Sequence, residues 1–579
     1  MFDYLANDVN DLFNILNEHI DSMFKITAII NFKNKYKIKR NEKIGEFCTE
    51  HMENRERGAV FTPIEIADYL IINSIKASDI IKNPFIKILD PCCGSGNILI
   101  PLFLYLKDIY RNNIQAVNSS NCLNLRLQDI ERHIIDNNIF GFDLDEFSLK
   151  ILKIDLFSVS YYINEENIRE RDYLLSEEEG KFHMIIGNPP YIGHKTVSSQ
   201  YSRILKSKYA IYKDKGDVSY CFFEKALQDM VNGGKLTYIT SRYFIEAPSG
   251  EILRRLIYEQ FSIEKIVDFY GFRPFKGKGI DTAILFLNKS MEQQDTVNII
   301  RPRSFKQRDF LRGLILNDEN TIRKYDIRMD SLQVKGWSLI EPKKKKIIDK
   351  IYENTFITLS NIARCHQGVI TGLDKAFVLN LNEIFENKIE SNLIKPWIKS
   401  SQISKYNIEY RNKNLIYTSG TLEADYPNTI KYLKPYKERL ERRRECRNGA
   451  RAWYELQWGR EEKNFTGEKI VFPYKASSNR FAIDNGSFHS ADIYGIKLKE
   501  NVPFTYKYLI SLLNSKTYEF YFKTFAKKLG GDMYDYYPNN LMKLSIPTMP
   551  VNEIGDDLYL YKYFGFTEEE INIIENMNI

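Results

Sequence analysis

The sequence of 579 residues contains few of the residues that bind metals or form disulfides. Its seven cysteines are scattered, only Cys92 and Cys93 are adjacent, and no two have CxxC spacing. An odd number of cysteines without that spacing argues against a disulfide framework and against a zinc site. The seven histidines include no HxxxH or HExxH arrangement, so we also expect no catalytic metal.

Long apolar runs and a strong charge imbalance are missing as well. No stretch reaches the roughly 18 apolar residues of a membrane helix, and the N-terminus lacks the pattern of a signal peptide. We therefore expect a cytoplasmic protein with no membrane partner. The net charge of +6 is too small to indicate a nucleic-acid partner by itself.

The length predicts more than one domain. Residues 1–54 have the apolar pattern of two amphipathic helices and are assigned to an N-terminal helical segment. In residues 55–300, short apolar strands alternate with helical segments, which predicts a Rossmann-like α/β domain with a doubly wound parallel sheet. Residues 301–355 are charged and are assigned to a connecting segment. Residues 356–579 contain short aromatic-rich strands and a helix at 505–525, and predict a C-terminal α+β domain. The strands expected in the α/β domain are 86–90, 138–144, 182–188, 235–241, 263–269 and 282–288.

A glycine-rich turn follows the first of these strands and precedes a helix. It contains Asp90, Cys92, Gly94 and Gly96. The glycines allow a tight turn and a close approach to a ligand, and the N–H groups at the start of a helix suit a carboxylate. The turn lacks the third glycine of GxGxxG, which weakens a dinucleotide interpretation. Alone, it is a weak signal for a cofactor site.

Acidic residues also end the next strands. Asp143 can accept hydrogen bonds from ribose hydroxyls and Leu144 can pack against adenine, while Asp145 could equally cap the following helix. Asp172, followed by Tyr173, could end a further strand, where a carboxylate can accept a hydrogen bond from an adenine amine.

Phe61, Thr62 and Pro63 stand upstream, before a helix expected to begin near residue 64. Thr62 as the N-cap, with Pro63 in the first helical position, explains both residues without a functional role.

The tetrapeptide Asn188, Pro189, Pro190 and Tyr191 follows the third strand. Two prolines can simply stop a strand and stiffen a turn. The functional interpretation explains more residues: the Asn188 side-chain oxygen and the Pro189 carbonyl can accept both hydrogens of an exocyclic amine and localise its lone pair. Tyr191 can then stack on a base turned out of a duplex.

The second half contains a basic and aromatic cluster. Eight Lys or Arg lie between residues 434 and 451, and Trp453, Tyr454 and Trp458 follow. A solvated helix with salt bridges and a face that binds phosphates are equally good explanations of this cluster in isolation. For the basic segment 194–215, a loop facing a nucleic acid and a surface helix are both allowed.

The order of these motifs resembles the gamma class of amino-methylating DNA methyltransferases, of which the TaqI enzyme is the familiar type. The gap between Asp90 and Asp143 exceeds the roughly 20 residues of a simple βαβ unit, and an insertion at about 108–132 accounts for it. The resemblance implies adenine N6-methylation in double-stranded DNA by a monomer, with S-adenosyl-L-methionine as cofactor, S-adenosyl-L-homocysteine as product and no metal. It implies Asn188, Pro189, Pro190 and Tyr191 as catalytic residues, stacking of the flipped base on Tyr191 and Phe275, and a cofactor site made by Phe61, Thr62, Asp90, Cys92, Gly94, Asp143, Leu144, Asp172, Tyr173 and Asn188.

Residues 356–579 are similar to the target-recognition domain of this class. Their landmarks are 367–372, 393–397 and 512–515. Segments 442–446, 453–460, 473–475 and 535–538 are closer still to the clostridial orphan adenine methyltransferases, which implies an A-rich asymmetric site, no attached nuclease and action at the bacterial nucleoid. The implied DNA-binding residues are Lys195, Arg442, Arg443, Arg444, Trp453, Tyr454, Trp458, Arg460, Lys475 and Tyr536.

Other functions fit less of the sequence. Cytosine N4 enzymes usually carry Ser at the position of Asn188, and RNA enzymes with similar motifs generally lack so large a second half. About 55 residues precede Gly58, too few for a nuclease domain, which disfavours a combined restriction enzyme and methyltransferase. A silent DNA-binding module does not need Asn188 and its neighbours. The remaining alternative is the methyltransferase component of a restriction-modification system.

Overall fold

The structure is a computed structural model, and it describes residues 2–51, 61–177, 180–193, 196–213, 216–275, 279–290, 292–303, 310–420, 423–529, 532–547 and 557–577. The chain divides into two compact units, residues 1–341 and 342–579. Each unit has sheets and apolar cores of its own.

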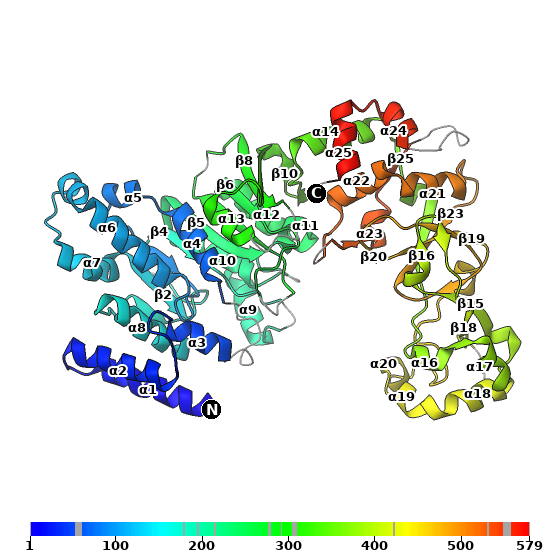
Figure 1. The fold of residues 1–579 in the computed structure, drawn as a ribbon, viewed down its shortest axis with the longest axis horizontal. Coiled ribbons are helices and arrows are strands. Elements are labelled where there is room, and N and C mark those ends of the chain that lie inside the picture. Colours follow the sequence, from blue (N-terminus) through cyan, green and yellow to red (C-terminus); the bar gives the residue numbers. More distant parts are fainter. Residues whose placement is uncertain are drawn as a thin grey trace. The chain divides into compact units, whose positions relative to one another are not determined.

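The first unit is built on a nine-stranded sheet with helices on both faces (Figure 1). This confirms the predicted doubly wound α/β fold, and all six predicted strands are present. The strands, in sheet order, are β3 (Ile168–Glu170), β2 (Ile139–Asp143), β1 (Ile88–Asp90), β4 (Phe182–Gly187), β5 (Met230–Ser241), β7 (Thr282–Asn288), β6 (Ser262–Asp268), β8 (Thr296–Pro302) and β9 (Ile322–Arg328).

The sheet is parallel from β3 to β5, but β7 runs antiparallel to both β5 and β6. The sequence pattern predicts a parallel sheet. Residues 269–281 join β6 to β7, its immediate neighbour, and an antiparallel pair needs no crossover helix. Because β6 and β8 again run parallel to each other, the carboxyl ends of β1, β2, β4, β5, β6 and β8 lie on one edge of the sheet.

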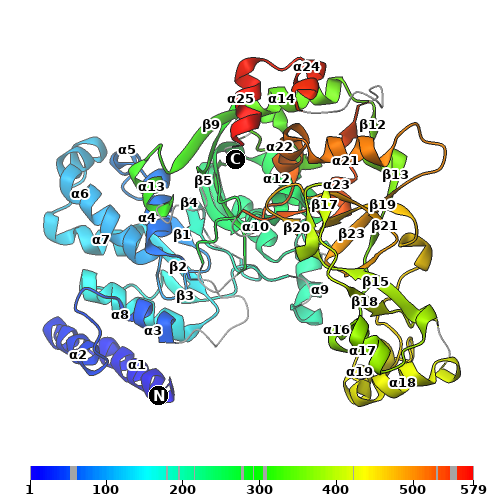
Figure 2. The ribbon, with the colours of Figure 1, turned by 45° about the vertical axis from the view of Figure 1, so that its right-hand side comes forward.

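Apolar side chains of the helices fill a core on each face of the sheet. One core includes α4 (Ile64–Ser74), α6 (Leu99–Asn121), α7 (Ile130–Asn137), α8 (Glu146–Ser160) and α13 (Phe310–Leu316). The other includes α9 (Ser199–Lys208), α10 (Ser219–Asp229) and α12 (Glu251–Gln260). Figure 2 shows these helices around the strands of the sheet. The second half of α6, with a kink at Asn113, and α7 occupy the region of the predicted insertion.

The N-terminal segment forms three helices, α1 (Phe2–Asn17), α2 (Ser22–Lys35) and α3 (Ile44–His51), where we expected two. They bury Ile151, Ile154 and Phe157 of α8 in a core of their own. The carboxylate of Asp155, also on α8, accepts hydrogen bonds from the first two amides of α3, at 3.0 Å from Ile44 and 2.8 Å from Gly45. Residues 1–54 are therefore part of the first unit.

The expected connecting segment, residues 301–355, is divided between the two units. It completes β8 and contains α13, β9 and a short hairpin of β10 (Leu332–Gln333) and β11 (Gly336–Trp337), all in the first unit. It also contains α14 (Pro342–Glu353), whose Ile347, Ile348 and Ile351 are buried in the core of the second unit. Several of the charges that suggested a linker, among them Lys324, Arg328 and Lys345, are exposed on these elements.

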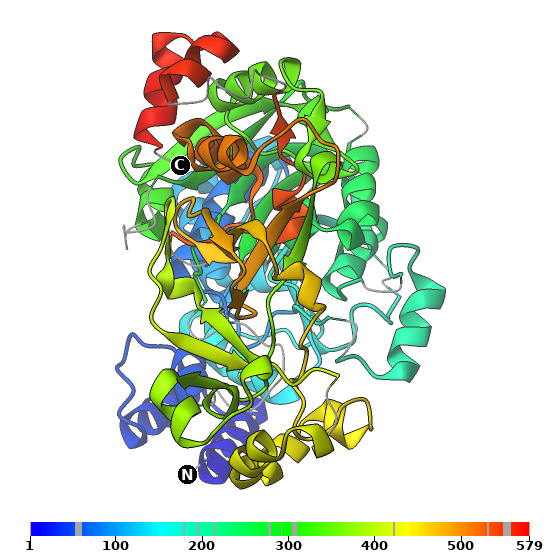
Figure 3. The same ribbon diagram turned by 90° about the vertical axis from the view of Figure 1, so that its right-hand side faces the viewer.

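The second unit contains two four-stranded sheets (Figure 3). One has the order β13 (Ala363–Gln367), β23 (Ile493–Leu498), β19 (Glu468–Pro473) and β21 (Ala482–Asn485). The other has the order β14 (Val378–Asn380), β18 (Lys413–Ile416), β15 (Ile394–Ile398) and β22 (Phe488–His489).

The predicted long helix at 505–525 of the second unit is two helices, α21 (Tyr506–Asn514) and α22 (Lys516–Phe525). Ser515 separates them because its extended backbone ends α21, and its hydroxyl caps α22 by accepting from the amide of Tyr518. Asn514 exchanges two hydrogen bonds with the backbone of Phe481, so this sequence landmark fastens the helix pair to β21.

Candidate active site

The glycine-rich turn lies at the carboxyl edge of the sheet and is tied to the neighbouring strand. Gly94 and Gly96 both have positive φ, at 49° and 89°. A side chain at Gly96 would approach Leu152 Cδ1 to 2.3 Å, so only glycine fits there. The amide of Gly94 donates to the Asp143 carboxylate at 2.8 Å, which joins the turn to the end of β2.

Two acidic residues of the predicted cofactor site are held by this turn. Asp90 is buried at the end of β1, accepts from the amide of Cys92 at 3.2 Å, and its burial raises its pKa to about 8. Burial also raises the pKa of Asp143, whose second oxygen accepts from the amide of Asp145 at 2.9 Å. Leu144, between them, is 65% exposed and free to pack against a ligand. Asp145 caps α8, which confirms the structural interpretation of that residue.

Asn188 stands directly after β4 and is linked to two other predicted residues. Its amide nitrogen donates to the hydroxyl of Thr62 at 3.2 Å. Its side-chain oxygen accepts from the hydroxyl of Tyr191 at 2.7 Å. Thr62 is therefore buried against the tetrapeptide and does not cap α4, which Pro63 precedes without a side-chain hydrogen bond. Phe61, next to Thr62, is 39% exposed.

Tyr191 and Phe275, the two predicted stacking residues, contact each other. Their ring centroids are 6.3 Å apart with a 54° angle between the planes. Phe275 is buried, and burial raises the pKa of Tyr191 well above its usual value, so Tyr191 remains a donor. In this arrangement the side-chain oxygen of Asn188 accepts a hydrogen bond from the Tyr191 phenol. The rings of Tyr191 and Phe275 lie against each other.

The turn that carries Asp172 is held more firmly than the sequence indicated. One carboxylate oxygen of Asp172 accepts from the amides of Leu174 and Leu175 at 3.0 and 3.2 Å. The hydroxyl of Tyr201, on α9, donates to the other oxygen at 3.0 Å. Tyr173 is 3% exposed and packs against Phe142 in the core, so its side chain is not offered to a ligand as we had expected.

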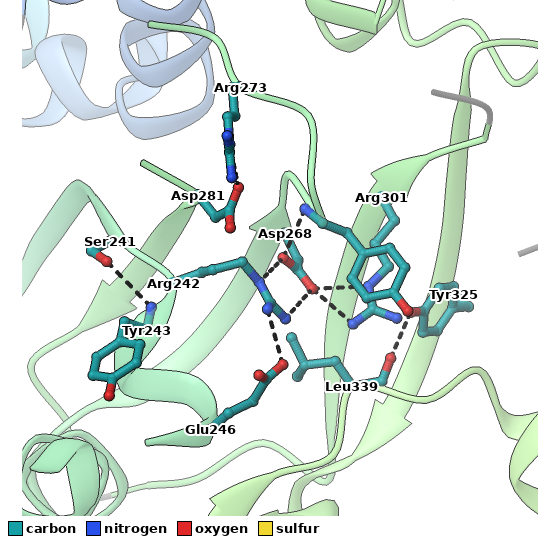
Figure 4. Close-up of polar contacts among 11 residues, drawn as sticks. Ser241, Arg242, Tyr243, Glu246, Asp268, Arg273, Asp281, Arg301, Tyr325 and Leu339 are labelled. Carbon is teal, nitrogen blue, oxygen red and sulfur yellow. Dashed lines mark hydrogen bonds and ion pairs between the residues drawn. The ribbon is translucent and has the colours of Figure 1, made fainter. Parts of the chain in front are cut away.

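A buried group of charges holds the loop that leads to Phe275 (Figure 4). The carboxylate of Asp268, at the end of β6, accepts from the guanidinium groups of Arg242 at 2.9 Å and Arg301 at 2.7 Å. Burial alone would raise the pKa of Asp268, but the two arginines lower it. Asp268 also accepts from the amide of Tyr270, whose φ of 41° turns the chain sharply, and Arg301 lies 4.3 Å from the Tyr270 ring centroid.

Sequence reasoning missed this group of charges. A signal was present, because Asp268 is a charged residue inside a predicted buried strand. A buried carboxylate requires partners, and Arg242 directly follows the predicted strand 235–241. Arg301 gave no such signal, because it falls in the segment expected to be a connection.

The predicted DNA-binding residues of the second unit separate into exposed and buried groups. Arg443 donates to the backbone oxygens of Thr371, Trp453 and Glu455, so it braces the polypeptide and is not available to a phosphate. Tyr536 is 1% exposed, stacks on Phe522 and donates to Asn479, which makes it a core residue. Lys195 lies outside the described residues. Arg442, Arg444, Trp458, Arg460 and Lys475 are exposed, and Trp453 and Tyr454 are half-buried.

Some of the exposed residues have intramolecular partners. Arg442 forms an ion pair with Glu438, and Arg460 donates to the Gln367 side chain at 2.6 Å. Lys437 lies over the Trp453 ring, 5.3 Å from its centroid. Exposed pairs of this kind contribute little to stability, so these groups can exchange partners for a ligand.

Within the described parts of the chain, no three His, Cys, Asp or Glu side chains are grouped in a way that could hold a metal ion. No helix among the same residues has the length and apolar character required to span a bilayer.

Family models match three parts of the chain. Residues 137–275 match the Eco57I restriction-modification methylase, residues 79–177 match the DNA-methyltransferase domain of MmeI, and residues 395–546 match the TaqI-like C-terminal specificity domain. The type II methyltransferase M.BanIII of Aneurinibacillus aneurinilyticus is 23% identical over 79% of this chain and 83% of its own length. The chain is related to the type II DNA methyltransferases.

Other relatives include a protein with two activities in its name. The type II restriction enzyme and methyltransferase RM.Eco57I of Escherichia coli is 22% identical over 89% of this chain, which spans 60% of that protein. Among solved structures, the type IIL restriction-modification enzyme MmeI in complex with DNA has a TM-score of 0.54 at 13% identity, over 82% of this chain and 65% of its own. At that identity the likeness concerns the fold alone, and it agrees with the α/β sheet described above.

Proposed function

We propose that this protein transfers a methyl group from S-adenosyl-L-methionine to the N6 atom of an adenine flipped out of double-stranded DNA. The observation that carries the proposal is the position of Asn188: at the end of β4, hydrogen-bonded to Thr62, on the same sheet edge as Asp90 and the glycine-rich turn. When bound, S-adenosyl-L-methionine supplies an activated methyl group on a sulfonium, and S-adenosyl-L-homocysteine remains.

The residues around the turn fit such a cofactor. Asp90 is a buried carboxyl group with a raised pKa, and a cationic amino group beside it would offset its burial. The amides of the turn at the start of α6 suit a carboxylate. Asp143 and the exposed Leu144 lie at the end of β2, where an adenosine would find an acceptor and an apolar surface.

Asn188 and Pro189 supply the acceptors that the reaction requires. Adenine N6 is a poor nucleophile because its lone pair is delocalised, and two acceptors on its hydrogens localise that pair. The Asn188 oxygen accepts one hydrogen bond from the Tyr191 hydroxyl and has a second lone pair for the amine of the base. In the proposed complex the flipped base stacks on the rings of Tyr191 and Phe275.

Double-stranded DNA is the proposed partner of the second unit. Arg442, Arg444, Arg460 and Lys475 carry exposed cations for phosphates, and Trp458 is 40% exposed. We further propose an A-rich asymmetric site and action as a monomeric orphan enzyme. A methyltransferase within a restriction-modification system is the second candidate, which the match to RM.Eco57I favours.

The proposal is tested by Asn188→Ala and by sequencing of methylated bases. Wild-type protein with S-adenosyl-L-methionine should produce N6-methyladenine at one sequence. Asn188→Ala should lower the rate by at least about 100-fold, because an acceptor used in the transition state is lost, while cofactor and DNA binding persist. Asn298→Ala is the matched control, because among the described residues the side chain of Asn298, on β8, bonds only Asp326. Unchanged turnover in Asn188→Ala, or methylation of another atom, would refute the proposal.

A further inference from the structure

Two side chains of α9 and that of Tyr209, the residue that follows the helix, hold the turn that carries Asp172. The Tyr201 hydroxyl donates to the Asp172 carboxylate at 3.0 and 3.3 Å. At the other end of the helix, the Tyr209 hydroxyl donates to the carbonyl of Leu174 at 2.5 Å and the Lys208 ammonium to that of Leu175 at 2.8 Å. The contacts of Tyr209 and Lys208 hold the backbone of the turn, and of these three side chains only Tyr201 contacts the Asp172 carboxylate.

The hydrogen bonds on Asp172 leave one of its oxygens with spare capacity. Oδ1 accepts from the amides of Leu174 and Leu175 and is within 3.3 Å of the Tyr201 hydroxyl. Among the residues that the structure describes, Oδ2 accepts a hydrogen bond only from the Tyr201 hydroxyl, at 3.0 Å. Since each carboxylate oxygen can accept two hydrogen bonds, Oδ2 can take one more.

We propose that Tyr201 is a positioning residue that orients the Asp172 carboxylate so that its Oδ2 atom accepts a hydrogen bond from the exocyclic amine of the cofactor's adenine. This inference rests on the proposed function, because it deepens the assignment of the cofactor site. It makes Tyr201 a determinant of selectivity for an amine over an oxygen at position 6 of the purine.

The surroundings of Tyr201 suit this role. Burial, followed by the nearby Asp172 charge, raises the pKa of Tyr201, so the phenol remains a donor throughout the range in which enzymes work. The amides of Leu174 and Leu175 hold one oxygen, and the phenol holds the other, so the plane of the carboxylate is defined from two sides. A carboxylate that is fixed before binding loses less freedom when the ligand arrives.

A purely structural role is less consistent with the contacts. The backbone of the turn is already held by Lys208, by Tyr209 and by the Ser176 hydroxyl, which donates to the carbonyl of Asp172 at 2.6 Å. The Tyr201 ring would keep its packing in Tyr201→Phe, and only the hydroxyl on the carboxylate would be lost.

The experiment measures binding of two cofactor analogues by calorimetry. S-adenosylhomocysteine has a donor at position 6 of its purine, and S-inosylhomocysteine has an oxygen there. Wild-type protein should prefer the adenosyl compound. Tyr201→Phe should weaken its binding about tenfold and leave binding of the inosyl compound unchanged, since one hydrogen bond to a charged acceptor is misaligned.

Two further variants separate positioning from scaffolding. Tyr212→Phe is the matched control, because its buried hydroxyl has no hydrogen-bond partner among the residues that the structure describes. It should bind both compounds as the wild type does. In the Asp172→Asn background, Tyr201→Phe should have no further effect, because Tyr201 acts through the carboxylate.

The possible outcomes are distinct. Equal weakening of both compounds by Tyr201→Phe, no weakening of either, or a full effect in the Asp172→Asn background would overturn the positioning role while the wild-type protein still binds S-adenosylhomocysteine. A wild-type protein that binds neither compound would instead refute the proposed function, and the positioning role with it.

Discussion

At the end of β1, Asp90 is a buried carboxyl group whose pKa burial raises to about 8. In the proposed complex it faces the amino group of S-adenosylhomocysteine, and an ammonium beside it lowers its pKa again. Cofactor binding below pH 8 therefore releases a proton. The sign follows from linkage: a reaction that releases protons becomes more favourable as the pH rises.

The first prediction is that affinity for S-adenosylhomocysteine rises from pH 6 to pH 8, by up to about tenfold per pH unit. Calorimetry in buffers of different ionisation enthalpy should detect the released proton. Asp90→Asn should bind more weakly and lose this pH dependence. An affinity that is constant over this range in wild-type protein contradicts the role given to Asp90.

Adjacent arginines in the second unit differ in their contacts. Arg443 donates to three backbone oxygens, whereas Arg444 is exposed on α20 (Arg444–Arg447). We predict that Arg443→Ala lowers the free energy of unfolding by about 2–4 kcal/mol, because it leaves these carbonyls without a partner. Arg444→Ala should leave stability unchanged and reduce the salt dependence of DNA binding by about one phosphate contact.

Urea unfolding and DNA-binding titrations at several salt concentrations separate these two effects. The opposite pattern, with Arg444→Ala destabilising and Arg443→Ala affecting only DNA binding, would contradict the assignment. The distinction was not available from the sequence, where residues 442–444 are three consecutive arginines.

On the scale of elements, α3 connects the N-terminal helices to the glycine-rich turn. Its first amides bind Asp155 of α8, and a side chain added at Gly45 would lie only 3.0 Å from the Ser95 hydroxyl. Burial raises the pKa of Asp155 to about 6, although its hydrogen bonds with the two amides lower it. The docking of α3 therefore depends on pH.

We predict that Asp155 makes the protein less stable as the pH rises from 4 to 6. The folded-state pKa lies above the unfolded one, so the folded state binds more protons in this window and loses that advantage as they leave. The loss is about 3 kcal/mol, at roughly 1.4 kcal/mol per pH unit. Urea unfolding at intermediate pH values should show this slope in wild-type protein and in Asp108→Asn, an exposed control on α6, but not in Asp155→Asn.

Six of the nine strands of the first unit could be predicted because each is a short apolar run between turn residues. The strands β3, β8 and β9 were not among the six, since β3 has only three residues and β9 mixes apolar with charged ones. The direction of the strands could not be predicted: β7 is as apolar as β5 and β6, and only its short connection to β6 makes it antiparallel to them. In the same way, residues 188–191 and 90–96 identified the candidate site, since their spacing along the chain carries information. Contacts between distant residues, such as Tyr201 with Asp172, leave no pattern in one sequence.

At the scale of the whole molecule, the chain forms two units, and in the second unit the first and last segments contact each other. In the second unit, β12 (Ile357–Thr358) pairs with β25 (Ser545–Ile546). Lys350 of α14 forms an ion pair with Glu570 of α25 (Glu568–Asn576). The beginning and the end of this unit thus stabilise each other, and the charged sequence around residue 343 concealed a helix that belongs to its core.

We predict that residues 342–579 fold as a separate fragment and that residues 356–579, the domain expected from the sequence, do so less stably. The shorter fragment lacks Ile347, Ile348 and Ile351, each of which contributes roughly 1.5–3 kcal/mol by burial. Thermal unfolding of the two purified fragments measures the difference. Equal stability would show that α14 is not needed by this unit.

The two ends of the segment between β4 and β5 are paired with each other in the first unit. Gly193 and Asp217 form a β-bridge, and the amide of Val218 donates to the carbonyl of Ile192 at 3.0 Å. A loop with joined ends can lengthen at a cost of only about 0.6 kcal/mol for each doubling. Evolution can therefore insert or remove residues here without disturbing the register of the sheet, and among diverged relatives this segment should vary in length more than the strands on either side.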